Sequence, residues 1–169
     1  MAHNGTVSGL AACRHKHYMM NCDQFEGLLA RANHRCEICE RPGVDTEHRQ
    51  LYIDHALEPG NRDWAVRGLL CGKCNSRLRR GEAFSPEAER FLTNAWYRQQ
   101  MERAGVPPEG PPEPEHGFCD QFGRFWEQRR GRWSQPNGHG RARHRNLSWR
   151  GLVGELGPHN IADSLADSP

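Results

Sequence analysis

The fold prediction rests on three stretches of the chain: Cys36-Glu37-Ile38-Cys39, Leu51-Tyr52-Ile53-Asp54-His55 and Val66-Arg67-Gly68-Leu69-Leu70-Cys71-Gly72-Lys73-Cys74-Asn75. Two CxxC pairs bracket an Asp-His dipeptide, and an asparagine directly follows the last cysteine. Two residues between paired cysteines allow a tight turn that points both sulfurs at one ion. The 31 residues between the pairs are enough for a hairpin to leave the metal and return to it.

The paired cysteines predict a structural zinc site. A closed site of four thiolates has no open coordination position, so this zinc is not expected to be catalytic. A redox role for either pair would need a surrounding βαβ pattern, which the sequence lacks. Four unligated buried cysteines would not explain two matched pairs in so polar a chain. The predicted ligands are Cys36, Cys39, Cys71 and Cys74.

The segment between and after the cysteine pairs predicts two strands followed by a helix. Residues 50–56 read as a strand that ends at the Asp-His dipeptide, and residues 64–70 read as the return strand of a β-hairpin. Residues 58–63 are typical of a turn or exposed loop. Residues 72–80 have a helical pattern, with Gly81 placed to end the helix.

Asp54, His55 and Asn75 are the candidate catalytic residues. Carboxylate and amide oxygens are ligands that Mg²⁺ accepts, with water and substrate phosphate filling the other positions. A neighbouring imidazole can take a proton from an attacking water. Together these groups could hydrolyse a phosphodiester, provided that the first strand meets the start of the helix.

This order of features resembles the recombination endonuclease VII family, a branch of the His-Me finger (ββα-metal, HNH-like) nucleases. The resemblance covers about residues 21–81 and rests on the cysteine pairs, the Asp-His and the Cys-Asn junction. It implies that the cysteines hold structural Zn²⁺, that His55 is the general base, and that Asp54 and Asn75 hold a catalytic Mg²⁺ or other divalent cation. It also places Arg67 near the site.

The resemblance implies a small α+β fold: a zinc-stapled ββα-metal (His-Me finger) core with flanking helices and a largely irregular C-terminal extension. The chain departs from the family in two places. Some members carry a further histidine shortly after the Asp-His and an acid one turn after the asparagine. Leu57 and Leu78 occupy those places here.

Composition fits a small metal-stapled core with extensions. Only 36% of the 169 residues are hydrophobic, and the mean hydropathy is −0.91. The sequence shows neither a hydrophobic signal region nor an apolar run of membrane length. Cysteines spaced as metal ligands suit a reducing compartment. We therefore expect no membrane partner and a location in the cytoplasm of a bacterium or a phage-infected host cell.

Two flanking helices are predicted. Asn21 to Asn33 has a capping residue, Gln24 at the capping-box position and one apolar stripe. Ser85 to Arg103 starts with Ser-Pro-Glu and keeps helical apolar spacing. The stripe of this second helix could pack on the zinc core or on a second subunit, and the sequence leaves a homodimer open.

The remaining segments divide the chain further. Residues 1–20 read as an arm, in which Cys13, His15, His17 and the later Cys22 could bind a second metal. Five prolines in residues 106–115 predict a stiff linker. In residues 118–150, arginines are mixed with aromatic residues, and this segment could contact nucleic acid or form a disordered or partly helical basic tail. The predicted divisions are 1–20 arm, 21–105 zinc-stabilised nuclease domain with its helices, 106–115 linker, 116–151 Arg/aromatic-rich extension and 152–169 disordered tail.

The leading functional hypothesis is a metal-dependent DNA endonuclease. The sequence does not separate cleavage of a four-way (Holliday) junction or other branched DNA from general nicking of double-stranded DNA in bacteriophage packaging or defence. The competing hypothesis is a non-catalytic zinc-stabilised module that binds nucleic acid, in which Asp54, His55 and Asn75 are structural.

Overall fold

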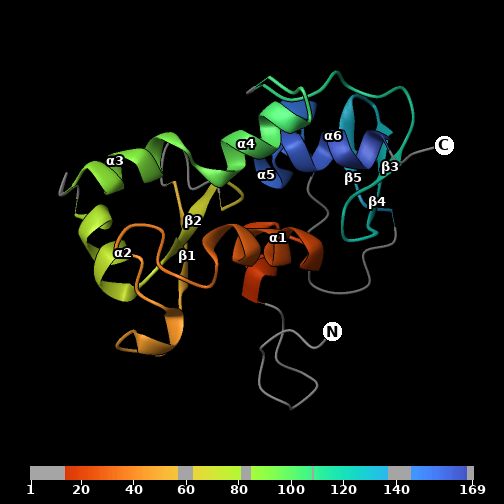
Figure 1. Cartoon of the computed structure of the whole chain (residues 1–169). Helices are drawn as coiled ribbons and strands as arrows, with labels where there is room; N and C mark the ends of the chain where they lie inside the picture. The colour runs from red at the N-terminus through yellow and green to blue at the C-terminus, as the bar shows by residue number, and fades with distance from the viewer. Residues whose placement is uncertain (1–13, 57–62, 81–84, 108, 137–145, 167–169) are drawn as a thin grey trace, which may run out of the picture. The chain divides into compact units, whose positions relative to one another are not determined.

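The computed structural model describes residues 14–56, 63–80, 85–107, 109–136 and 146–166 (Figure 1). The chain divides into two compact units, Met1–Trp96 and Tyr97–Pro169. Both contain helices and short antiparallel strands, so the predicted mixed α+β class is confirmed at that level.

The first unit contains the predicted hairpin and helix. Strands β1 (Tyr52–His55) and β2 (Val66–Leu70) pair antiparallel, with Tyr52 opposite Leu70 at one end. Helix α2 (Gly72–Arg79) follows directly and packs against both strands. Residues 58–62 of the predicted loop and the helix stop at Gly81 lie outside the described residues.

Helix α1 (Cys22–Ala32) confirms the first predicted flanking helix. Asn21 accepts a hydrogen bond from the Gln24 backbone N–H at 2.8 Å, and the Gln24 side chain accepts one from the Asn21 N–H at 2.9 Å. This reciprocal capping box satisfies two otherwise unpaired donors at the helix start. Leu28 and Ala32 are buried, and α1 packs against β2. Two short 3₁₀ helices, η1 (Arg14–Tyr18) and η2 (Gly43–Asp45), flank it along the chain.

The predicted helix from Ser85 to Arg103 is two helices, α3 (Pro86–Thr93) and α4 (Trp96–Arg103). Ser85 caps α3 by accepting a hydrogen bond from the Ala88 N–H at 3.2 Å. The break falls at Asn94, whose carbonyl accepts a hydrogen bond from Arg31 at 3.3 Å. Helix α3 packs on β2, and its Phe91 lies in the core beside the paired cysteines. Of the two packing partners considered for this stripe, α3 therefore uses the zinc core. Packing on a second subunit stays a prediction.

The second unit corrects the expectation of an irregular extension and a disordered end. Strands β3 (Phe118–Cys119), β4 (Phe125–Arg129) and β5 (Arg132–Ser134) form an antiparallel sheet in that order. Helices α5 (Trp149–Leu156) and α6 (Pro158–Ala166) follow. The physical reason is a shared aromatic and aliphatic core. It consists of Phe118, Trp126, Trp133, Leu152, Val153, Leu156 and Ile161, all buried.

The proline-rich segment also packs within this second unit instead of acting as a free spacer. The Trp149 indole N–H donates to the carbonyl of Pro111 at 2.9 Å, and the Trp133 indole N–H donates to the Glu113 carboxylate at 2.6 Å. A Cβ added at Gly110 would lie 2.5 Å from a Val153 methyl group, so only glycine permits this approach to α5. The segment thus supplies one backbone acceptor and one side-chain acceptor for indole donors of the second unit.

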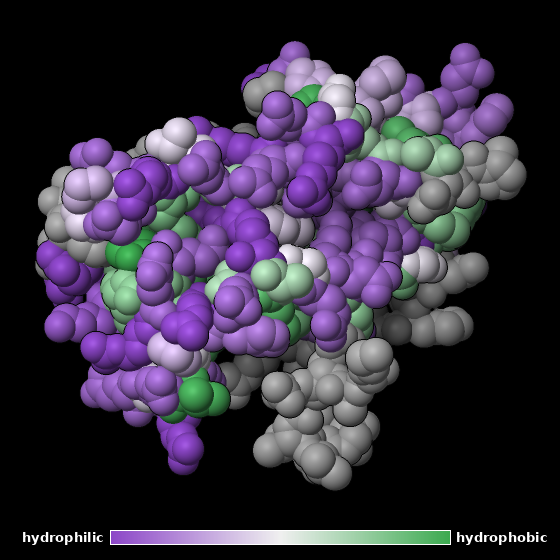
Figure 2. All heavy atoms as spheres, viewed as in Figure 1, coloured by the Kyte–Doolittle hydropathy of each residue, from purple (hydrophilic) through white to green (hydrophobic). Residues whose placement is uncertain are grey.

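Figure 2 shows hydrophilic residues over most of the visible face, with hydrophobic residues in small separate patches. This surface accords with the low hydrophobic content of the chain. None of the described helices has both the length and the apolarity needed to cross a bilayer.

Candidate active site

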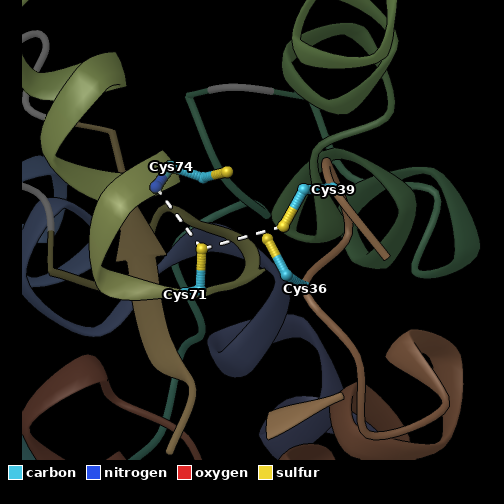
Figure 3. A group of neighbouring side chains, drawn as sticks. All are labelled: Cys36, Cys39, Cys71 and Cys74. Carbon is cyan, nitrogen blue, oxygen red and sulfur yellow. Dashed lines mark hydrogen bonds between the residues drawn. The ribbon is translucent and has the colours of Figure 1, made fainter. Parts of the chain in front are cut away.

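Four cysteines from two parts of the chain converge at the edge of the hairpin (Figure 3). Cys36 and Cys39 come from the loop after α1, while Cys71 and Cys74 come from the end of β2 and the first turn of α2. Their sulfur atoms lie within 4.8 Å of one another, and Cys39 Sγ is 3.8 Å from Cys71 Sγ. A tetrahedral zinc with 2.3 Å bonds separates its sulfurs by about 3.8 Å. The cluster therefore fits zinc, and the predicted ligand set is brought together.

The cluster is largely enclosed, since Cys36, Cys71 and Cys74 are buried and only Cys39 is exposed. Burial raises the pKa of Cys36 and of Cys74, and the neighbouring thiolate charges raise the pKa of Cys74 further. For Cys39, burial acts in the same direction, but hydrogen bonds from the backbone and from neighbouring thiols outweigh it and lower its pKa. Four thiolates at this spacing repel one another, so a bound cation is needed to hold them all ionised.

Glu37, between the first two cysteines, ties the zinc loop to β2. Its backbone N–H donates to the Leu69 carbonyl at 3.0 Å, and its carboxylate accepts from the Leu69 N–H at 2.8 Å. Arg31 on α1 pairs with the same carboxylate at 2.5 Å and donates to the Arg67 carbonyl at 2.8 Å. The loop that carries two zinc ligands is thereby fixed to the strand beside the candidate catalytic residues.

Gly68 explains why the Val-Arg-Gly sequence needs its glycine. A Cβ at this position would lie 2.5 Å from the Phe91 ring, 2.6 Å from the Glu37 carboxylate and 2.7 Å from the Arg31 guanidinium. The Arg31–Glu37 pair and α3 can approach β2 this closely only because residue 68 has no side chain. This network is not evident from the sequence, because an arginine before a CxxC and a glutamate inside it give no local signal that they pair.

Asp54 is bound by Arg67 from the opposite strand. The Arg67 Nε lies 2.6 Å from Asp54 Oδ2, and Nη2 lies 2.9 Å from Oδ1. The Asp54 side chain is 2% exposed and that of Arg67 is 19% exposed. Paired ionic hydrogen bonds of this kind offset the cost of burying a carboxylate. The structure thus places Arg67 directly on a predicted metal ligand.

A β-bulge makes this pairing geometrically available. Asp54 lies opposite Gly68, but the next residue, His55, lies opposite Val66, so Arg67 is an extra residue in β2. In a regular ladder Arg67 would point to the opposite face of the hairpin from Asp54. Bulges increase the local twist and redirect side chains, and they are frequent next to active sites.

His55 and Asn75 each have a buried polar atom whose hydrogen-bonding capacity is not used by any described group. Within the described residues, His55 Nδ1 and Asn75 Oδ1 have no hydrogen-bond partner. The His55 ring lies 5.2 Å from the Tyr18 ring, centroid to centroid, at an interplanar angle of 58°. Buried polar atoms without partners are rare and call for an explanation such as a bound ion or a catalytic role.

Asn75 also borders a surface pocket of about 390 Å³. Tyr52 and His48 line it, and their rings meet edge to face at 6.3 Å. Lys73 and Arg80 add two cationic side chains to the lining. Asp54 and His55 are not among the lining residues of this described pocket. Glu47 also lines the pocket, which therefore surrounds Asn75 with two basic side chains and one acidic side chain on the α2 side of the hairpin.

Asp54 and Asn75 carry side-chain oxygens of the type that hard divalent cations bind. Asn75 contributes a buried side-chain carbonyl oxygen that accepts no hydrogen bond from any described group. Asp54 contributes a carboxylate whose oxygens each keep a second lone pair beside the Arg67 bonds. Oxygen ligands from one carboxylate and one amide, completed by water, are what Mg²⁺ accepts.

The second metal group suggested for the N-terminal arm is only partly visible. His15 Nε2 lies 3.7 Å from Cys22 Sγ, and the buried His15 ring stacks on Phe25 at 4.9 Å. Cys13 lies outside the described residues. Among the described histidines, cysteines and acids, the four paired cysteines are the one group close enough to share an ion.

A model of the recombination endonuclease VII family matches residues 12–100 of the chain. The matched segment contains the cysteine cluster, the Asp54–Arg67 pair, His55 and Asn75. No curated protein and no solved structure matches the chain.

Proposed function

Because the chain belongs to the recombination endonuclease VII family, a family of nucleases, we propose that it is a metal-dependent DNA endonuclease that hydrolyses phosphodiester bonds. The observation that carries the proposal is the family match over residues 12–100, which spans every candidate site residue. The close cysteine cluster supports a structural zinc within the same segment.

We assign the base to His55 and the divalent-cation ligands to Asp54 and Asn75. The unpartnered Nδ1 of His55 can accept a proton from an attacking water when the other ring nitrogen carries the hydrogen. The Asp54 carboxylate and the Asn75 carbonyl would hold Mg²⁺, which when bound supplies positive charge for the phosphate and the leaving oxygen. This arrangement is a His-Me finger in our proposal, with β1, β2 and α2 as its ββα unit.

Zinc has a separate task in this proposal. Its four thiolate positions are closed, so it holds the loop at Cys36 and Cys39 against the start of α2 and takes no part in hydrolysis. Since Asn75 follows Cys74 directly, the zinc site fixes the position of the Asn75 backbone. Lys73 and Arg80 at the nearby pocket outnumber its one acidic residue, Glu47, and supply charge that favours a DNA phosphate.

The test is nicking of a supercoiled plasmid by the zinc-loaded chain with and without Mg²⁺. His55→Ala should lower the rate by about 10²- to 10⁴-fold, the usual contribution of a general base, while zinc content stays unchanged. His116→Ala is the matched control, because His116 is exposed and lies outside the family match. Equal cleavage by the His55 variant would remove that residue from the base role. Absent cleavage by the wild-type chain would favour the non-catalytic zinc-stabilised nucleic-acid-binding module.

We further propose branched DNA as the preferred substrate, because the family is one of recombination endonucleases and branched DNA is the structure that recombination produces. A four-way junction and a linear duplex of the same arm sequences should be compared under one set of conditions. Faster cleavage of the junction supports the proposal. Equal rates on both would assign the chain to general nicking of double-stranded DNA.

A further inference from the structure

The sheet of the second unit has two different faces. Phe118, Trp126 and Trp133 are buried on the inner face, against α5 and α6. Period-two alternation sends Phe125 and Arg129 to the outer face, where both are exposed. Phe125 is 48% exposed, with its ring lying over Gly117.

The turn between β4 and β5 has an unexpected residue. Arg130 and Gly131 form a two-residue connection with φ values of 52° and 71°. Positive φ at both positions defines a type I′ turn, which favours Asn-Gly, Asp-Gly or Gly-Gly. Arginine pays a steric penalty in this conformation. Local departures from turn chemistry point to a function for the side chain involved.

The arginines around this turn repel one another. Arg129 and Arg132 lie directly opposite each other at the ends of β4 and β5, and like charges in this position are destabilising. Glu127 pairs with Arg129 at 2.6 Å and compensates one charge. Neither Arg130 nor Arg132 takes part in an ion pair within the described part of the chain. The tip therefore carries an excess of two exposed positive charges.

We propose that this tip, residues Arg129 to Arg132 and called here the arginine hairpin, docks on the phosphate backbone of duplex DNA. Phosphates would relieve the repulsion between the opposed guanidinium groups and would pair with the arginine placed in the strained turn. A two-stranded ribbon also fits the width of the major groove. The hairpin lies outside the family match, so it would be an accessory site of this chain. The inference rests on the proposed function only in taking DNA as the polyanion.

Duplex binding in the presence of a chelator tests the docking surface without cleavage. The variant Arg130→Asn/Arg132→Gln removes two charges and restores Asn-Gly at the turn, so the hairpin should fold at least as well. We expect the slope of log Kobs against log salt to become shallower by about 1.8, or about 0.9 for each lost phosphate contact. Affinity at low salt should fall more than tenfold.

The charge-matched control is Arg98→Gln/Arg103→Gln, two exposed arginines on α4, and it should leave the slope unchanged. A hairpin variant with the wild-type slope would overturn the proposal. An unchanged slope with lost binding to polyglutamate would instead assign the hairpin to an acidic protein partner. Plasmid nicking by the wild-type chain is scored separately. Hairpin-dependent binding without any nicking would reject the nuclease and leave the docking surface standing.

Discussion

Arg67 holds both carboxylate oxygens of Asp54, at 2.6 Å and 2.9 Å, on a hairpin where the carboxylate is almost fully buried. In the proposed nuclease the same carboxylate is a ligand of the divalent cation. Arg67 therefore compensates the Asp54 charge before the cation arrives, and it lies beside the site when the cation is bound. Its guanidinium is then placed to share its charge between Asp54 and an incoming phosphate.

Removing Arg67 should make the stability of the first unit depend on divalent cations. In Arg67→Ala the buried Asp54 carboxylate has lost its partner, which typically costs about 3–5 kcal/mol. Mg²⁺ bound at Asp54 would restore compensation, so the melting temperature of this variant should rise more steeply across a magnesium titration than that of the wild type. Arg79→Ala, at an exposed position on α2, is the control. Parallel titration curves for wild type and Arg67→Ala would show that Asp54 is no cation ligand.

Loss of one zinc ligand should unfold the first unit. Cys71 is buried with its sulfur within 4.8 Å of the other three, and in a core this small the free energy of zinc binding is folding free energy. Cys71→Ser should lose bound zinc, measured by elemental analysis, together with helical circular dichroism. Cys119→Ser changes an exposed cysteine far from the cluster in sequence and should keep both. A folded, zinc-free Cys71 variant would contradict the structural role of the metal.

Gly68→Ala tests the packing of the zinc loop on β2. The added methyl would lie 2.5 to 2.7 Å from Phe91, Glu37 and Arg31, and Phe91 is buried, so the network must shift. Overpacking of this kind costs about 1–3 kcal/mol. Chemical denaturation should show the loss, and nicking should fall with it if the loop positions the site. Gly27→Ala is the control, since nothing lies within 4 Å of a Cβ there and helix α1 should gain slightly.

The sequence predicts the features that local chemistry controls. The Asn21–Gln24 capping box and the cysteine cluster depend on residue types at short fixed spacings, and both are present in the structure. The Arg67–Asp54 pair could not be predicted in this way. Regular alternation places these side chains on opposite faces, and only a bulge brings them together.

The folded second unit was missed for a related reason. Its core is assembled from Phe118, Trp126 and Trp133 on three short strands and from Leu152 and Ile161 on two helices. Each segment is short, and arginines, glycines and prolines interrupt the apolar pattern between them. Periodicity within a single window therefore stays weak, although the aromatic side chains bury a large area once they meet.

The structure shows what Leu78 contributes at the position one helical turn after Asn75, where the chain departs from its family. Leu78 stands where some relatives carry an acid, and it packs partly buried against the core that includes the zinc cysteines. The side chain thus adds apolar contact beneath α2 instead of a charge beside the site. The sequence shows that the acid is absent, but only the structure shows what the leucine contributes in its place.

The second unit should lose stability in mild acid because of His159. Burial on α6 lowers the pKa of His159 from 6.5 to about 4. Between these values the unfolded chain binds a proton that the folded chain does not, so stability falls as the pH is lowered through about 6.5 towards about 4. The full shift corresponds to roughly 3 kcal/mol. His159→Gln cannot titrate at this position, so the difference in unfolding free energy between wild type and this variant should be largest at pH 7 and shrink as the pH falls.

The measurement needs a probe confined to the second unit, because zinc ligands of the first unit also protonate in acid. The ¹⁹F resonance of fluorotryptophan at the buried Trp133 supplies one, read during urea unfolding at each pH. A constant difference between the two proteins from pH 7 to 4.5 would show that His159 keeps its ordinary pKa in the folded unit.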